Sequence, residues 1–493
     1  MPDSQFRLAR GDSFKSIVQK QVVVVGGGPA GFVAAISAAR NGAETLLVER
    51  FECLGGASTG GLVLGFHTPR VHIDAKDKNA YQSVLYQGDQ VVRGIFQEIH
   101  DRLLAMGGTV GRKGEATSRP PFDPELMKLL ADQMVQEAGV ETWLQTLATD
   151  VAMEGDRVVG VVVENKSGRH LLKADVVIDC SGDGDVAALA GASFQFGRPE
   201  DGRPMAASTA FITGDVDFER AIAYLKEHPE DSGAGDIRQW EEIFRRNQQI
   251  SISGLRASVH RAYENGDFPV ALRAKTHIPG AGSIRQVIRM GKVYPSEAIH
   301  IWDTVYELDG TDHKQLTEAI MFSRQYIYDI VQFLRKYIPG FENTHIIETA
   351  SQFGVRGTRR IIGDHVLTAD EIVEGRKFED VIARGGRALN VHAELGGNPG
   401  HWRETIDGRS YDIPYRCLVP SKVEGLLVAG RCISVDHMGL GSVRGIPLCH
   451  ATGEAAGAAA ALAAKERVSP RQVDLRTLQK RLVEQGVDLG AQR

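Results

Sequence analysis

Cysteine is scarce in this sequence. The 493 residues include five cysteines, and no two of them form a C-x-x-C pair. The closely spaced thiolates that hold iron–sulfur clusters and structural zinc are therefore missing, and we expect no metal site. An odd and sparse set of thiols also argues against a disulfide framework and favours a reducing compartment.

A surplus of positive charge and long apolar runs are also missing. The 57 basic residues are outnumbered by 63 acidic residues, so the charge pattern gives no general attraction to nucleic acid or anionic membranes. The amino terminus has no apolar core like that of a secretory signal. The longest run of small uncharged residues, 455–464, is half of the ~20 residues that span a bilayer. We expect a soluble, cytoplasmic protein.

Glycine, in contrast, is abundant. The chain has 55 glycines in 493 residues, more than the usual share of about 7%. Hydrophobic residues make up 42% and charged residues 24%, which are ordinary values for globular proteins. The length predicts about three domains. The positions of the glycines therefore carry most of the information.

The first glycine cluster follows a run of valines. Residues 21–25 predict a strand buried on both faces, and residues 32–42 predict an Ala-rich helix. Between them, Gly26, Gly28 and Gly31 have the G-x-G-x-x-G spacing. In this motif the first glycine allows a tight turn, the second lets a pyrophosphate approach the backbone, and the third lets helix and strand pack closely. The arrangement predicts dinucleotide binding at the start of the helix, although a tight turn without a ligand has the same spacing.

An acidic residue ends the next predicted strand. Residues 43–48 are apolar, and Glu49 follows them at the position where such folds bind a ribose diol. An acid here favours a ribose without a 2′-phosphate, and hence FAD or NAD over NADP. A second glycine-rich segment, residues 51–67, then favours FAD because it offers a loop that can wrap a longer ligand. A flexible surface loop is the alternative.

Further apolar segments predict the rest of the nucleotide domain. Turn signals separate several short β-type segments, which predicts an antiparallel meander beside the parallel sheet. A final strand precedes a long helix rich in alanine and glycine. The predicted strands are 139–147, 148–153, 157–164, 170–173, 175–179 and 423–431, and the predicted helix is 443–465.

Together these motifs resemble the glutathione-reductase-like FAD fold, and more closely the bacterial FAD-dependent oxidoreductases described as fumarate-reductase-like. The resemblance runs from about residue 20 to 465. It rests on VVVVGGGPAG (22–31), ADVVIDCSGDGDVA (174–187), GVRGTRRIIGDHVLT (354–368), GLLVAGRCIS (425–434) and GSVRGIPLCHATGEAAG (441–457). It implies an α/β fold class: a Rossmann-like FAD-binding domain with a parallel sheet and β-meander, formed by residues 1–195 and 413–493. Residues 196–412 would form an inserted α+β substrate or cap domain, with helices near 217–227, 237–247 and 316–337.

The resemblance also implies the residues that hold FAD. The first loop would hold the pyrophosphate, Glu49 the ribose, Leu147 the adenine, and the segment 441–443 the flavin. The full expected set is Gly26, Gly28, Pro29, Ala30, Gly31, Glu49, Arg50, Gly55, Gly56, Ala57, Ser58, Thr59, Leu147, Ser181, Gly182, Asp183, Gly430, Arg431, Gly441, Ser442 and Val443. Gly430 and Arg431 match the motif that contacts the ribityl chain of the flavin. Relatives often carry an acid at position 431, so the resemblance does not decide what Arg431 contacts. Some related proteins bind flavin covalently through a histidine beside the second glycine loop. The nearest histidine here, His67, lies six residues after Gly61, so we expect noncovalent FAD.

Three residues are candidates for catalysis. His437 matches a substrate-binding histidine of fumarate-reductase flavoproteins, and its alternative is a loop histidine bonded to backbone. Arg444 would begin the long predicted helix, where the helix dipole disfavours a cation, so we expect an anionic partner for it. Arg356 belongs to a basic cluster that would meet either an acidic substrate or nearby acids.

The leading hypothesis is an FAD-dependent dehydrogenase or reductase. It would transfer a hydride between the flavin and a small organic molecule, with carboxylic acids among the candidates. One alternative is a flavin-dependent monooxygenase. Another is an electron-transfer subunit that works with a partner acceptor protein. We expect a homo-oligomer, and the sequence leaves the substrate and the electron acceptor open.

Overall fold

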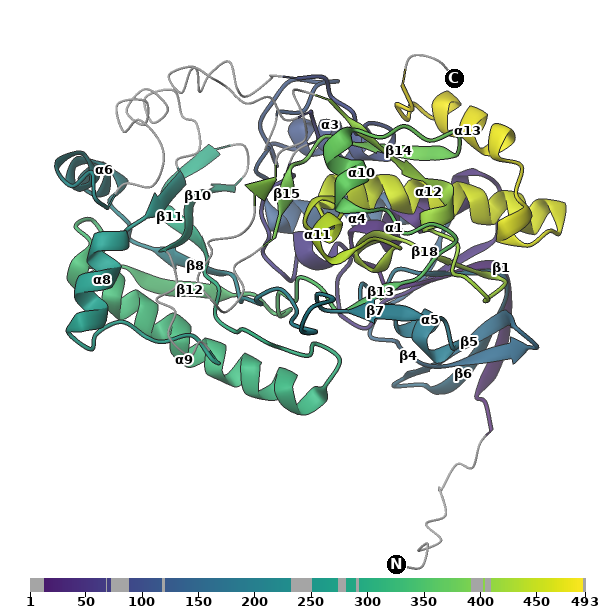
Figure 1. The fold of residues 1–493 in the computed structure, drawn as a ribbon, viewed down its shortest axis with the longest axis horizontal. Helices are drawn as coiled ribbons and strands as arrows, with labels where there is room; N and C mark the ends of the chain where they lie inside the picture. The colour runs from purple at the N-terminus through teal and green to yellow at the C-terminus, as the bar shows by residue number, and fades with distance from the viewer. Residues whose placement is uncertain are drawn as a thin grey trace, which may run out of the picture.

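The computed structural model describes residues 13–67, 69–71, 88–117, 120–231, 251–273, 281–289, 292–391, 402–403 and 409–490. Within these residues the chain forms two lobes, each with its own sheet (Figure 1). The expected α/β fold class with a parallel sheet and a meander is confirmed. The expected helix 237–247 lies outside the described residues.

The larger lobe contains a seven-stranded sheet of described residues in the order β3-β2-β1-β6-β5-β4, with β18 also paired to β6. Its strands are β1 (Ser16–Val25), β2 (Thr45–Val48), β3 (Glu141–Trp143), β4 (Leu147–Glu154), β5 (Arg157–Asn165), β6 (Gly168–Asp179) and β18 (Leu426–Val428). The strands β1, β2, β3, β6 and β18 are parallel, whereas β4, β5 and β6 form the antiparallel meander.

The strand β6 corrects one expectation. The predicted strands 170–173 and 175–179 are a single strand, because β6 pairs with β5 along its first half and with β18 along its second. The strand β1 pairs with it along both halves. Since the ladder continues without a gap, no turn separates the meander from the parallel sheet here.

The predicted helix 443–465 is also wrong in one respect. Its observed counterpart is α12 (Ile446–Glu466), which begins three residues later than expected and follows a separate short helix, α11 (His437–Val443). Pro447 explains the break, because proline lacks an N–H and its ring would clash with the carbonyl group of Val443 in a continuous helix. The helix α12 then packs against α1 (Pro29–Arg40), as Figure 1 shows.

The larger lobe also contains five further helices and three small two-stranded sheets among its described residues. The helices are α3 (Ile95–Ala105), α4 (Pro124–Glu137), α5 (Asp185–Leu189), α10 (Ala369–Glu374) and α13 (Leu475–Glu484). The small sheets pair β7 (Phe194–Phe196) with β13 (Arg359–Ile361), β14 (Val381–Gly385) with β17 (Tyr411–Pro414), and β15 (Leu389–Asn390) with β16 (Trp402–Arg403).

The second lobe, here called the cap, has a five-stranded sheet of described residues in the order β12-β8-β11-β10-β9. Its elements are β8 (Phe211–Gly214), α6 (Phe218–Glu227), β9 (Ser251–Gly254), α8 (Arg256–Glu264), β10 (Ala281–Arg289), β11 (Lys292–Ile301), α9 (His313–Tyr337) and β12 (His345–Thr349). Large side chains such as Trp302, Tyr326 and Phe341 give it a hydrophobic core separate from the core of the larger lobe. The domain boundaries 195/196 and 412/413 stay a prediction.

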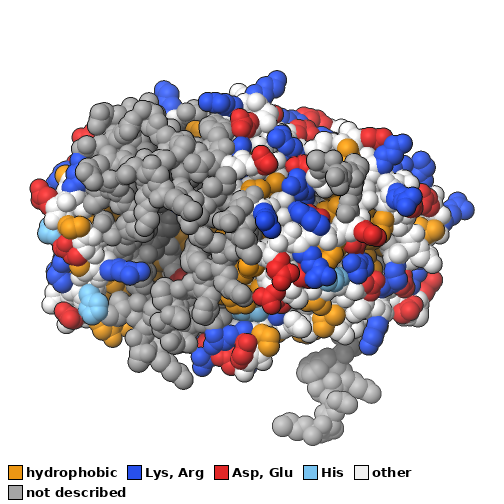
Figure 2. Space-filling model, turned by 45° about the horizontal axis from the view of Figure 1, so that its top comes forward, with side chains coloured by type: hydrophobic (Ala, Val, Ile, Leu, Met, Phe, Trp, Pro, Cys, Tyr) orange, Lys and Arg blue, Asp and Glu red, His pale blue; other side chains and the backbone are white. Residues whose placement is uncertain are grey.

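The described surface carries mixed charge. On the face shown in Figure 2, the acidic and basic side chains are interspersed rather than gathered in one patch. None of the described helices combines the length and the apolar character that crossing a membrane requires.

Candidate active site

The first glycine loop joins β1 to α1. A Cβ atom on Gly26 would lie 2.5 Å from the carbonyl oxygen of Cys180, and one on Gly31 would lie 1.6 Å from the carbonyl oxygen of Gly26. Both positions therefore exclude any side chain. A Cβ on Gly28, in contrast, would have no atom within 4 Å. The middle glycine thus faces open space, which a pyrophosphate could enter.

Glu49, at the end of β2, is buried beneath this loop. One carboxylate oxygen accepts the backbone N–H of Gly27 at 2.5 Å, and the other accepts that of Phe51 at 2.8 Å. The acid thus fixes the loop and keeps acceptor capacity for a ribose hydroxyl, because each carboxylate oxygen can accept two hydrogen bonds. Arg50 is exposed and lies over the ring of Phe51.

The second glycine loop abuts the first. The N–H of Gly55 donates to the carbonyl oxygen of Gly27 at 2.8 Å, and a Cβ on Gly56 would lie 2.9 Å from the Cα atom of Gly28. Ser58 is fully buried, and its hydroxyl has no hydrogen-bond partner among the residues that the structure describes. A buried hydroxyl without a partner is costly, so this loop is suited to a ligand with oxygen or nitrogen atoms.

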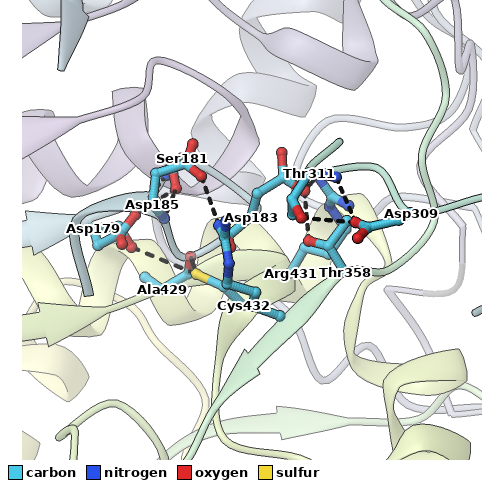
Figure 3. A network of polar contacts seen from close by, with 11 residues as sticks. Asp179, Ser181, Asp183, Asp185, Asp309, Thr311, Thr358, Ala429, Arg431 and Cys432 are labelled. Atoms are coloured by element: carbon cyan, nitrogen blue, oxygen red, sulfur yellow. Dashed lines mark hydrogen bonds and ion pairs between the residues drawn. The ribbon is translucent and has the colours of Figure 1, made fainter. Parts of the chain in front are cut away.

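A polar network closes the carboxyl end of β6 (Figure 3). The carboxylate of Asp179 accepts the N–H and hydroxyl of Ser181 and the N–H of Ala187. Burial raises the pKa of Asp179 to about 6, and these hydrogen bonds lower it only in part. The result is a rigid turn at residues 181–183, next to the glycine loops.

Arg431 is part of this network. Its guanidinium pairs with Asp183 at 2.8 Å, and the same carboxylate oxygen accepts the hydroxyl of Thr358 at 2.6 Å (Figure 3). The neighbouring Gly430 has φ +82°, and a Cβ there would lie 2.8 Å from the Cβ of Ala30. The second terminal nitrogen of Arg431 is buried without a partner. The contact of Arg431 that the sequence left undecided is thus an ion pair with Asp183. The second terminal nitrogen of Arg431 can still donate a hydrogen bond.

Four turns therefore meet at one edge of the sheet. They follow the carboxyl ends of β1, β2, β6 and β18, which are parallel strands, and they carry most of the expected cofactor residues. Leu147 is an exception. It begins β4, and its side chain is 51% exposed. The open space at Gly28, the buried hydroxyl of Ser58 and the spare N–H group of Arg431 together fit FAD.

The segment 441–443 lies on α11. The hydroxyl group of Ser442 donates to the carbonyl oxygen of Arg387 at 2.5 Å and contacts the hydroxyl group of Tyr411 at 2.6 Å. A Cβ on Gly441 would lie 2.8 Å from the backbone of Asn390. This packing holds α11 against β15 and the residues that precede it.

Arg444 follows α11 directly. One terminal nitrogen donates to the carbonyl oxygen of Asn390 at 3.2 Å, and its Nε atom is buried without a partner. Burial, together with the positive charges of Arg387 and Arg356, holds the pKa of Arg444 well below its usual range. Arg444 is the C-cap of the short helix α11 and lies two residues before the first residue of α12, so it precedes the long helix instead of beginning it. The dipole of α11 favours a cation at this position, whereas the dipole of α12 disfavours one.

Arg356 and Asp303 lie near Arg444. Arg356 pairs with Asp303 at 2.8 Å, and it also donates to the carbonyl oxygen of Ala206 and the hydroxyl of Ser208. From the cap strand β10, Arg285 lies 3.4 Å from the Nε2 atom of His67. We call Asp303, Arg356, Arg387 and Arg444 the arginine cluster, because the charges of the first three act on the pKa of Arg444. It contains three cations and one acid, and it includes residues from both lobes.

The structure separates His437 from Arg444. They lie at opposite ends of α11. Burial lowers the pKa of His437 to about 4, and Arg360 and Arg198 lower it further than the nearby acids raise it. Of the three expected catalytic residues, only Arg356 and Arg444 therefore share the arginine cluster.

Sequence reasoning missed Arg285, Asp303 and Arg387. Asp303 lies two residues after the last residue of β11, and no sequence motif marks any of the three. Their meeting depends on chain segments far apart in sequence.

Several known proteins are similar to this chain. The digeranylgeranylglycerophospholipid reductase of Picrophilus torridus is 29% identical over 34% of this chain and 40% of its own length. The digeranylgeranylglycerophospholipid reductase 2 of Methanococcoides burtonii is 25% identical over 49% of this chain and 57% of its own length. The chain thus matches between 40% and 57% of the length of these curated relatives. A solved structure of a geranylgeranyl bacteriochlorophyll reductase-like protein from Thermoplasma acidophilum covers 96% of this chain and 85% of its own, with 13% identity and a TM-score of 0.41.

A family model gives the clearest result. The model of the FAD dependent oxidoreductases matches residues 21–482, which confirms FAD as the cofactor and oxidoreductase as the class of enzyme. The resemblance inferred from the sequence is correct: the chain belongs to the family of FAD-dependent oxidoreductases.

Proposed function

We propose that this oxidoreductase transfers a hydride between noncovalently bound FAD and a small organic acid whose carboxylate is held by Arg444. Bound FAD supplies the hydride acceptor or donor. The residues of the chain bind and orient the substrate and exclude water from it. The reductase names of the curated relatives support this class of chemistry.

The observation that carries the proposal is the lack of an acidic partner for Arg444 within the described part of the chain. Among these residues its guanidinium donates to the backbone carbonyl group of Asn390, and its buried Nε atom has no partner. A buried cation is costly unless an anion or several acceptors compensate it. A carboxylate fits a guanidinium well, because two parallel N–H groups can donate to its two oxygens.

The surroundings of Arg444 support a substrate rather than a protein acid as the partner. Asp303 is the one acid in the arginine cluster, and its carboxylate already pairs with Arg356. In this proposal Arg356 acts as a positioning residue, because its own N–H groups hold the backbone and hydroxyl of the segment 206–208. Arg387 adds positive charge beside Arg444, since a Cβ on Gly445 would lie 3.1 Å from its guanidinium.

A histidine is available at the same place. The ring of His67 contacts Arg285 of the cap, and a Cβ atom on Gly445, the residue after Arg444, would lie 3.6 Å from the carbonyl oxygen of His67. The geometry favours His67 over His437 as the histidine that touches the substrate, because the groups that act on the pKa of His437 do not include any member of the cluster. We propose that His67 contacts and orients the substrate together with Arg444.

Anaerobic titration of the flavin absorbance tests the proposal. The purified yellow protein is mixed with a panel of carboxylic acids, with their neutral methyl esters and, separately, with NADH or NADPH. We expect at least one acid to bleach the flavin, its ester to fail, and the Arg444→Met variant to lose the response. The matched control is Arg476→Met, an exposed arginine on α13. Equal bleaching by acid and ester would contradict the proposal, and bleaching by NADPH alone would favour a monooxygenase.

A further inference from the structure

Residues 351–360, here called the return segment, lead the chain from the cap back to the larger lobe. They follow β12 and end in β13. Gly354 and Ser208 exchange backbone hydrogen bonds at 2.9 and 3.2 Å, so the segment is still tied to the cap side of the molecule. Its two ends also contact turns that carry expected FAD-binding residues.

The first end of the return segment touches the second glycine loop. The carbonyl oxygen of Gly60 accepts the backbone N–H of Gln352 at 3.0 Å and the hydroxyl of Ser351 at 3.4 Å. A Cβ on Gly60 would lie 2.9 Å from the side-chain nitrogen of Gln352 and from the hydroxyl of Ser351. Glycine at position 60 therefore makes room for these two side chains.

The later part of the segment touches the turn after β6. Thr358 donates to the carboxylate of Asp183 at 2.6 Å, and Arg359 donates to the carbonyl oxygen of Asp183 at 3.1 Å (Figure 3 shows the first of these). The return segment thus runs from one FAD-site turn to another. It is held against both by hydrogen bonds.

Gln352 has a buried donor without a partner in the described part of the chain. Its side-chain nitrogen is inaccessible to solvent and makes no hydrogen bond to any described residue. Its side-chain oxygen is 3.9 Å from a Cβ on Gly56, and the same Cβ would lie 2.9 Å from the Cα atom of Gly28. The amide group therefore lies beside the place where the two glycine loops meet. The buried hydroxyl of Ser58, in the same loop as Gly56, lacks a partner too.

We propose that Gln352 binds FAD, so that the chain returning from the cap supplies part of the cofactor site. Its side-chain N–H group donates a hydrogen bond to an oxygen atom of the cofactor. Buried polar groups in native proteins are nearly always hydrogen-bonded, and FAD provides acceptors at this loop. The proposal rests on FAD as the cofactor and does not depend on the substrate proposed above.

FAD affinity of the apoprotein tests this inference. FAD is removed, and the dissociation constant is measured by the change in flavin fluorescence on rebinding, without any substrate. We expect Gln352→Ala to raise the dissociation constant about 10-fold or more, because a hydrogen bond to a buried acceptor is lost. Gln352→Glu keeps the shape of the side chain but cannot donate, so it should weaken binding at least as much.

Ser351→Ala is the matched control. Its hydroxyl contacts the same carbonyl oxygen of Gly60, but the residue is exposed, so we expect a change of less than about 2-fold. Thermal unfolding of each apoprotein shows whether a variant folds. A folded Gln352→Ala or Gln352→Glu protein that binds FAD as tightly as the unmodified protein would overturn the inference. An equal loss in Ser351→Ala would overturn it as well, because the effect would then come from the loop and not from the amide group.

Discussion

Gly453 of α12 lies directly against Ala30 of α1. A Cβ atom on Gly453 would be 2.1 Å from the carbonyl oxygen of Ala30, and one on Gly457 would be 2.2 Å from that of Ala34. The two helices therefore approach each other along their backbones. Because α1 begins at the first glycine loop, the position of α12 controls the shape of the FAD site.

Replacement of Gly453 by alanine should move the helices apart. Backbone atoms cannot yield as a flexible side chain can, so we expect Gly453→Ala to lower the free energy of unfolding by about 1–3 kcal/mol. The purified protein should also retain less FAD. Urea denaturation and the ratio of flavin to protein absorbance measure both effects. Lys465→Ala, at the exposed end of α12, should change neither.

Arg444 should lower the free energy of unfolding of the protein when no anionic substrate is bound. Replacing this buried cation by methionine removes an uncompensated charge, so we expect Arg444→Met to raise the free energy of unfolding by about 1 kcal/mol. The same variant should lose the response to the acidic substrate. Denaturation of the substrate-free protein measures the first effect. A strong loss of stability would show that Arg444 is compensated within the protein and would remove the case for a bound carboxylate.

Glu454 should make the protein less stable as the pH rises. Burial raises its pKa to about 8, although the N–H of Ile95 donates to it. Between the ordinary pKa of 4.5 and this value, the folded state keeps a proton that the unfolded state has lost. Stability should therefore fall with increasing pH across this range, by at most about 1.4 kcal/mol per pH unit. In Glu454→Gln the carbonyl oxygen can still accept from Ile95, and this part of the pH dependence should disappear. Identical profiles of the two proteins would refute the assignment.

His437 should have the opposite effect. Burial and nearby arginines lower its pKa to about 4, below the ordinary value of 6.5. Between these values the unfolded state binds a proton that the folded state lacks, so stability is complete above pH 6.5 and falls as the pH decreases towards 4. Urea denaturation at several pH values should show a smaller acid-side loss in His437→Gln. Equal losses in both proteins would indicate that His437 titrates normally.

The FAD loops could be predicted from sequence because their chemistry is local. The spacing of Gly26, Gly28 and Gly31 reflects contacts within one strand–turn–helix unit, and Glu49 ends the next strand. Each requirement is met by residues close together in the chain. Pro447, by contrast, was a local signal that the prediction overlooked: it is the second residue of α12 and marks the start of that helix three residues after the expected start.

The substrate side depends on segments that are distant in sequence. Asp303 follows β11 of the cap, whereas Arg387 and Arg444 belong to separate parts of the larger lobe. No periodicity or spacing relates them, because only the pairing of sheets and the packing of the two lobes bring them together. The sequence by itself determined the cofactor and the fold class, and it located the glycine-rich turns that we expect to hold FAD. The tertiary structure decided which arginines share a buried site, and it did so because burial and charge compensation arise only when distant segments meet.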